Sequence, residues 1–171
     1  MIHYRVYPGG KTRIVTFSYD DGAANDERLI RLFDLYGMKG TFHLNSGAFA
    51  DWNDADLEKL RERYKGHEIA CHTVHHCFPD EMPVASLSRE ITEDRRFLEQ
   101  LAGYPVQGMS YPNGAFNESV IRVMKNCGIV YSRTTKDTLG FHFPADFLQW
   151  HPSCHHRKAE ELSQKFMDTL D

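Results

Sequence analysis

Thr16-Phe17-Ser18-Tyr19-Asp20-Asp21-Gly22 joins an apolar run to two adjacent carboxylates and a glycine. The run starts at Ile14 and is rich in β-branched and aromatic side chains, which predicts a buried strand over 14–17. The acids would then sit where a strand ends, which is where α/β proteins with parallel strands build their active sites. The alternative is a simple turn followed by a helix cap, because Asp and Gly are common turn residues.

Strand and helix signals alternate along the rest of the sequence. Strands are predicted over 4–7, 40–44, 68–71, 106–111, 129–132 and 147–150. Helices are predicted after Asn25, after Asp54, from Ser86 or Ser88, and over 118–126 and 158–170. This alternation predicts parallel strands joined by helical crossovers. We therefore expect one α/β domain over 1–171, either an open sheet or a closed barrel.

Composition excludes several classes of protein. The chain has 171 residues, a net charge of -4 and no basic run, which argues against nucleic-acid binding. No apolar segment reaches the length of a membrane span, so no membrane partner is expected. The first residues lack a signal-peptide pattern, so we expect a cytoplasmic protein. The four cysteines form no C-x-x-C pair and are predicted to be free thiols.

Three polar clusters follow predicted strands: Asp20-Asp21, the histidines of 72–76, and the turn over 111–114. His72 and His76 are spaced i, i+4, which on one helical turn would bring both imidazoles to a single metal ion. An acid from a neighbouring strand would be the third ligand, leaving positions open for water and substrate. The alternative is that these are loop and capping histidines without a metal.

The motifs TFSYDDG (16–22), GHEIACHTVHH (66–76) and SYPNGAFN (110–117), in this order, resemble the polysaccharide deacetylase (NodB-homology) family. The resemblance extends roughly from Ile14 to Arg133. It implies a distorted (β/α) barrel of the polysaccharide-deacetylase type. It also implies hydrolysis of N- or O-acetyl groups of sugars, with one divalent metal and an acetylated sugar or oligosaccharide as substrate.

The resemblance also implies a role for individual residues. Asp20 would be the general base, and Asp21, His72 and His76 would bind the metal. Asn113 would provide a backbone N–H that stabilises the oxyanion. Zinc is the first choice of metal, with cobalt, nickel and manganese as alternatives, because two histidines and one aspartate suit several divalent ions.

The sequence departs from the family in two places. Ser110 stands where the family commonly carries an arginine that pairs with the base, and Arg133 would supply this charge instead. A surface or structural role for Arg133 is the alternative. The family also ends with a Leu-x-His strand whose histidine protonates the leaving amine, and no such strand is found. His155 or His156 would replace it, unless both are loop histidines.

A missing last strand would leave the barrel incomplete and one edge open. An open edge exposes unpaired backbone, which a second subunit could cover, so a homo-oligomer is expected. The sequence thus predicts a metal-dependent deacetylase acting on an amide or an ester. The alternatives are a non-catalytic metal- or carbohydrate-binding module that has lost its general acid, and a metal-free structural α/β protein.

Overall fold

The computed structural model describes residue 7, residues 10–11 and residues 13–168 of the chain. The strand predicted over 4–7 falls mostly outside these residues. Its last residue, Tyr7, forms an isolated antiparallel bridge with Lys11.

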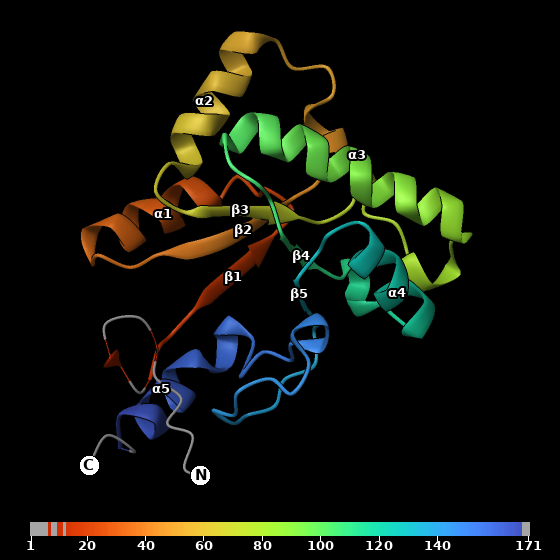
Figure 1. Cartoon of the computed structure of the whole chain (residues 1–171). Helices are drawn as coiled ribbons and strands as arrows, with labels where there is room; N and C mark the ends of the chain where they lie inside the picture. The colour runs from red at the N-terminus through yellow and green to blue at the C-terminus, as the bar shows by residue number, and fades with distance from the viewer. Residues whose placement is uncertain (1–6, 8–9, 12, 169–171) are drawn as a thin grey trace.

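Five parallel strands form one sheet in the order β1-β2-β3-β4-β5. They are β1 (Phe17–Asp20), β2 (Gly40–Leu44), β3 (Glu68–Cys71), β4 (Gly108–Ser110) and β5 (Tyr131–Arg133). Each strand pairs with the next one along the chain, so every crossover moves in the same direction and the sheet curls instead of reversing (Figure 1). This curled sheet confirms the predicted α/β class and the incomplete distorted barrel.

Among the described residues, four helices connect the strands and cover the outer face of the sheet, and a fifth follows β5 and lies apart from them (Figure 1). They are α1 (Asp26–Leu35), α2 (Asp54–Tyr64), α3 (Val84–Ala102), α4 (Glu118–Asn126) and α5 (Ala159–Asp168). Short 3-10 turns are η2 (Ser46–Phe49), η3 (Pro79–Glu81), η4 (Pro112–Gly114), η5 (Phe147–Gln149) and η6 (His156–Lys158). Helix α3 begins two residues before the predicted Ser86, directly after Pro83, which takes the N-cap position.

The side chains of β1 alternate between the hydrophobic core and the concave face of the sheet. The rings of Phe17 and Tyr19 pack against Phe33 of α1, with centroids 4.8 and 6.2 Å away. Successive side chains of a strand point to opposite faces, so Ser18 and Asp20 point to the inner, concave face of the curled sheet. The same alternation puts Phe42 in the core and His43 on the concave face.

The prediction of a buried strand over 14–17 is wrong, because β1 begins at Phe17. Ile14 and Val15 are 42% and 61% exposed. The partner strand β2 begins at Gly40, which lies opposite Phe17, so the residues before Phe17 have no backbone to pair with. Asp20 is consequently the last residue of the strand, and Asp21 is the first residue beyond it.

The strand predicted over 147–150 is also wrong for most of its length. The Asp146 carboxylate accepts the N–H of Leu148, which caps a 3-10 turn at η5. Trp150 alone continues alongside β5, through a parallel bridge to Arg133. The sheet therefore gains a single residue at the position where a closing strand would lie.

Two predictions from composition concern the cysteines and the absence of a membrane-spanning segment. All four cysteines are free thiols, as predicted, and Cys71 and Cys127 are buried. Among the described residues, no helix combines the length and the apolar character needed to cross a membrane. The cytoplasmic location and the oligomer stay predictions.

Candidate active site

The two adjacent carboxylates at the end of β1 point in different directions. Asp20 lies on the concave face, whereas the backbone turns at Asp21 and Gly22, whose φ angles are +74° and +63°. The turn is fixed by the N–H of Asp21, which donates to the carbonyl oxygen of His43 at 3.0 Å. The turn therefore gives the neighbouring acids separate surroundings, which adjacent acids need if they are to have different roles.

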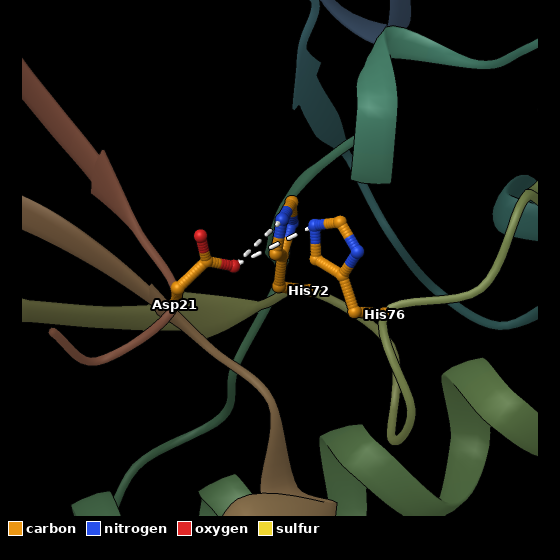
Figure 2. A group of neighbouring side chains, drawn as sticks. All are labelled: Asp21, His72 and His76. Carbon is orange, nitrogen blue, oxygen red and sulfur yellow. Dashed lines mark ion pairs between the residues drawn. The ribbon is translucent and has the colours of Figure 1, made fainter.

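Asp21, His72 and His76 converge from the loops after β1 and β3 (Figure 2). Asp21 Oδ1 lies 3.6 Å from Nε2 of His72 and 3.6 Å from Nε2 of His76. One ligand atom of each residue lies within 4.8 Å of the others. Ligand atoms at zinc distances of about 2.1 Å in a tetrahedron lie about 3.4 Å apart. The donor set and its spacing thus fit one divalent ion.

Ser110 fixes the tautomer of His72. The Nδ1 atom of His72 lies 2.9 Å from the carbonyl oxygen of Ser110, which can only accept, so Nδ1 carries the proton. Nε2 is left with its lone pair facing Asp21 and His76. A ligand histidine normally donates its other ring N–H to such a partner, which orients the ring. Burial lowers the pKa of His72, which keeps the imidazole neutral.

The helical turn predicted for 72–76 is wrong, because these residues form an irregular loop. The two rings still meet, with centroids 4.9 Å apart. Positive φ angles at Thr73 (+63°) and His76 (+51°) fold the loop back. The side-chain amide of Asn45 donates to the carbonyl oxygens of His72 and Thr73. The i, i+4 spacing therefore found the pair, although the backbone that brings the rings together is not helical.

The carboxylate of Asp94 on α3 binds the backbone at the start of the loop over 72–76. Its Oδ1 accepts the N–H of Ser46 at 2.8 Å, and its Oδ2 accepts the N–H of His72 at 2.9 Å. The residue is fully buried, and burial raises its pKa to about 6 despite the two hydrogen bonds. One buried carboxyl group thus joins the loops that follow β2 and β3.

Arg133 reaches across the concave face from β5 to β1. Its Nη2 contacts both carboxylate oxygens of Asp20, and the hydroxyl of Ser110 donates to Asp20 Oδ1 at 3.0 Å. Burial is the largest influence on the Asp20 carboxyl and raises its pKa. Electrostatic interaction with His43 and Arg133, together with the Arg133 hydrogen bonds, outweighs burial and lowers the pKa of Asp20 to about 2. Asp20 is therefore a carboxylate at neutral pH.

Backbone strain gathers around the site. Non-glycine residues with positive φ in the described part of the chain are Asp21, Thr73, His76, Asn113 and Leu139. All but Leu139 lie in the loops that carry the candidate site. Strained backbone of this kind concentrates at functional sites, because the surrounding structure must hold it in place.

Asn113 lies in η4, in the loop after β4, at the same edge of the sheet as the other candidates. Its φ angle of +58° turns the backbone between Tyr111 and Gly114. The N–H of Gly114 donates to the carbonyl oxygen of Tyr111, which closes the turn. Hydrogen bonds among the described residues do not use the N–H of Asn113.

His155 lies apart from these residues. It is exposed and takes the N-cap position of η6, where its Nδ1 accepts the N–H of Arg157 at 3.4 Å. Its backbone N–H donates to Asp137, and its ring packs against His156, with centroids 4.0 Å apart. None of these contacts within the described residues joins His155 to Asp20 or to the three candidate ligands.

Three residues near the site were missed in the sequence. Ser110 was noticed only as a missing arginine, yet it contacts both Asp20 and His72. Asp94 occupies the helical face of Leu87, Ile91 and Leu98, so an acid on an apolar stripe was the available signal. His43 is a polar residue inside an otherwise apolar strand, which gave a similar signal.

Comparison with known proteins gives the same family as the motifs. The polysaccharide deacetylase family matches residues 8–132 of the chain. The chain belongs to this family. The structure resembles IcaB from Ammonifex degensii, with a TM-score of 0.75, 14% identity and coverage of 94% of this chain and 75% of IcaB. It also resembles the Streptococcus pyogenes deacetylase PplD, with a TM-score of 0.71, 17% identity and coverage of 85% and 65%.

Two curated relatives share part of the sequence. A probable peptidoglycan-N-acetylglucosamine deacetylase of Arthroderma benhamiae is 30% identical over 112 residues, which are 64% of this chain and 26% of that protein. The putative polysaccharide deacetylase YxkH of Bacillus subtilis is 23% identical over 131 residues, 75% of this chain and 46% of that protein. The chain therefore spans less than half the length of either relative.

Proposed function

We propose that this protein hydrolyses acetyl groups from an acetylated sugar polymer, with one divalent metal held by Asp21, His72 and His76. The observation that carries the proposal is the joining of two groups through Ser110. Its hydroxyl contacts Nδ1 of His72 at 2.7 Å and Asp20 Oδ1 at 3.0 Å. An ionised carboxylate and a converging ligand set are thereby fixed side by side, which suits hydrolysis of an acyl group.

Asp20 is assigned as the group that takes a proton from the attacking water. A carboxylate has about four lone-pair positions, and Arg133 and Ser110 occupy about three, which leaves room for a water. The contact with Arg133 keeps Asp20 ionised, so it is always ready to accept a proton at neutral pH. The N–H of Asn113 would donate to the carbonyl oxygen as it gains charge, an interaction of about 3 kcal/mol in comparable sites.

The ligand set favours zinc, with cobalt, nickel and manganese as alternatives. When bound, the ion supplies Lewis acidity that polarises the acetyl carbonyl and acidifies a water. Burial lowers the pKa of His72 and favours its neutral imidazole. The contact of Nδ1–H with the carbonyl oxygen of Ser110 leaves the lone pair on Nε2. A neutral imidazole is the form that binds metal.

Metal titration and acetate release test the proposal together. We expect apoprotein to bind one equivalent of zinc in calorimetry, and the loaded protein to release acetate from N-acetylglucosamine oligomers or an aryl acetate. Replacing one ligand, as in His72→Ala, should lower zinc affinity and acetate release at least a hundredfold. Failure to bind zinc, cobalt, nickel or manganese would contradict the metal proposal.

His75→Ala is the matched control for His72→Ala. His75 belongs to the same loop, but its exposed ring contacts Glu90 on α3 at 2.7 Å instead of joining the ligand set. We expect this variant to keep both the zinc affinity and the activity of the wild type. A large loss in His75→Ala would mean that disturbance of the loop, and not loss of a ligand, explains the His72 result.

A second candidate is a metal- and carbohydrate-binding module without catalysis. The observation that favours it is the position of His155, whose described contacts are all within its own segment or with Asp137. A module of this kind would bind zinc and oligosaccharide, and wild type and Asp20→Asn would be equally inactive on a broad panel of amides and esters. Acetate release by the wild type alone would reject it.

A further inference from the structure

A row of buried and partly buried polar groups lies behind Arg133, on the concave face of the sheet. It runs from the carbonyl oxygen of Cys71 on β3, through His43 on β2 and Ser18 on β1, to Arg133 on β5. His43 is 1% exposed and lies opposite Asp20 in the register of β1 and β2. The residues that face Asp20 are therefore themselves held by a second set of partners.

With a neutral His43, the hydrogen bonds of this row can run in only one direction. The carbonyl oxygen of Cys71 can only accept, so the Nδ1 atom of His43, 3.3 Å away, carries the ring proton. Nε2 of His43 must then accept, and the hydroxyl of Ser18 donates to it at 2.9 Å. The Ser18 oxygen is left as an acceptor for Nε–H of Arg133 at 2.7 Å. Every member of the row is satisfied.

The guanidinium of Arg133 is fixed by acceptors on three sides. Nε donates to Ser18, Nη1 donates to the carbonyl oxygen of Thr134 at 3.1 Å, and Nη2 contacts Asp20. Because a guanidinium is planar with donors in a fixed fork, three acceptors in different directions set both its position and its plane. Without Ser18, rotation about the terminal bonds of the side chain would be restrained by only two groups.

We propose that His43 and Ser18 are positioning residues that lock the guanidinium of Arg133 in the orientation in which it holds the Asp20 carboxylate. The inference rests on the proposed role of Asp20 in acetyl hydrolysis. His43 acts as a neutral acceptor, in agreement with its burial, which lowers its pKa to about 3. A protonated His43 would have no lone pair for Ser18, and the direction of the whole row would be lost.

The proposal predicts different results for two kinds of substitution at Ser18 and at His43: those that remove the hydrogen bond and those that keep it. Ser18→Ala removes the acceptor for Nε–H of Arg133, whereas Ser18→Thr keeps a hydroxyl. His43→Phe keeps the ring shape but removes both hydrogen bonds, whereas the amide oxygen of His43→Gln reaches the position of Nε2 as an acceptor. Each pair compares a variant that lacks the hydrogen bond with one that keeps it, and melting curves report any packing effect of the change in volume.

The first measurement is spectroscopic and needs no activity. In wild type, we expect the Nε–H signal of Arg133, assigned by its loss in Arg133→Lys, to exchange slowly with solvent, and the ring nitrogens of His43 to show the Nδ1–H tautomer. Exchange should accelerate at least tenfold in Ser18→Ala and His43→Phe, and stay slow in Ser18→Thr and His43→Gln. Equal protection in Ser18→Ala and wild type, or an Nε2–H tautomer of His43, would overturn the proposal.

The second measurement is acetate release at saturating substrate. We expect kcat to fall about tenfold in Ser18→Ala and His43→Phe with KM nearly unchanged, and most of the loss to be recovered in the two conservative variants. Melting curves of all four variants will show that they are folded. Equal kcat losses in the conservative and disruptive variants would contradict the proposal. An inactive wild type with the expected spectra would reject only the proposed function.

Discussion

The loops that follow β1 and β3 are held by buried residues of other elements, whereas the segment that follows β5 is held mostly by hydrogen bonds within itself. Asp94, Ser110 and Asn45 hold the loop of His72 through its backbone and its ring. After β5, Thr134 contacts His151, and Tyr111 donates to the carbonyl oxygen of Leu148. The histidines beyond them, His155 and His156, are exposed.

This difference follows from the topology. Parallel strands bring their carboxyl ends to one edge, so residues far apart in the sequence meet there without any long connection. Within the described part of the chain beyond β5, only the bridge at Trp150 continues the ladder. Most later side chains are therefore positioned by local turns, although the ring of His156 stacks on Tyr19 of β1. The part of the candidate site that holds Asp20, Asp21, His72 and His76 is therefore positioned by the sheet, and the part facing it is not.

Asp20→Asn should have the largest effect on activity. The amide keeps the shape of the side chain but cannot accept a proton, so we expect kcat to fall roughly a thousandfold. Zinc affinity should change less than threefold, because Asp21 and the two histidines are intact. Steady-state kinetics and calorimetry on the same preparation measure the two effects. A parallel collapse of zinc affinity would show that Asp20 belongs to the ligand set.

Arg133→Gln tests the contact that joins β5 to β1. Without the positive charge, the pKa of Asp20 should rise from about 2, and the acidic limb of kcat/KM should move to higher pH. We expect kcat/KM near neutral pH to fall about thirtyfold. A pH–rate profile that is unchanged in the variant would remove Arg133 from the site.

The same variant predicts a pH-dependent loss of stability. The pKa of Asp20 in the folded protein lies below its usual value of 3.8, so its contribution to folding is present above pH 4 and lost as pH falls towards 2. A shift of this size corresponds to about 2 kcal/mol. Denaturant unfolding should therefore show the stability advantage of wild type over Arg133→Gln shrinking by up to about 2 kcal/mol between pH 6 and pH 2. Any part that comes from the lost hydrogen bonds to Ser18 and Thr134 should stay constant over this range. A difference that is constant with pH would contradict the ion pair.

Asp94→Asn should have an intermediate effect, on metal affinity. The amide can accept one of the two backbone N–H groups, but its NH2 then faces the other donor and cannot bond to it. We expect the loop of His72 to loosen and zinc affinity to fall about tenfold, as measured by competition with a chelator. Glu93→Gln, on the exposed side of the same helix, is the control and should match wild type. Equal affinities in both variants would reject the supporting role of Asp94.

The sequence predicted the candidate site best where the functional side chains lie close together in the loop that directly follows a strand. His72 and His76 were predicted as ligands from their spacing, although that spacing was explained by a helical turn that does not exist. The choice of Asp21 as the third ligand came from the family resemblance. Irregular backbone with positive φ angles produced the same convergence. Residue spacing identifies the candidate ligands of such a loop but does not predict its backbone conformation, because that conformation depends on tertiary partners such as Asn45 and Asp94.

The contacts of the other residues depend on how the strands pair and on how the sheet curls, which a single sequence does not reveal. Arg133 was predicted to supply the missing charge, and its contact with Asp20 requires β5 to curl towards β1. The roles of Ser18 and His43 depend on the pairing of β1 with β2, which brings Ser18 next to His43 across the concave face. In contrast, only Phe17 of the apolar run over 14–17 belongs to a strand, because β2 begins opposite it at Gly40.

His155→Ala should have the smallest effect and tests the segment after β5 directly. His155 is an exposed cap of a short turn, so we expect acetate release to stay within twofold of wild type and stability to fall by less than about 1 kcal/mol. The pH–rate profile of kcat/KM should keep its basic limb. A hundredfold loss of kcat together with loss of that limb would show that this segment moves onto the site and supplies the acid. In that case the sheet would position only the residues proposed to activate water, and substrate binding would have to bring the segment of His155 onto the site.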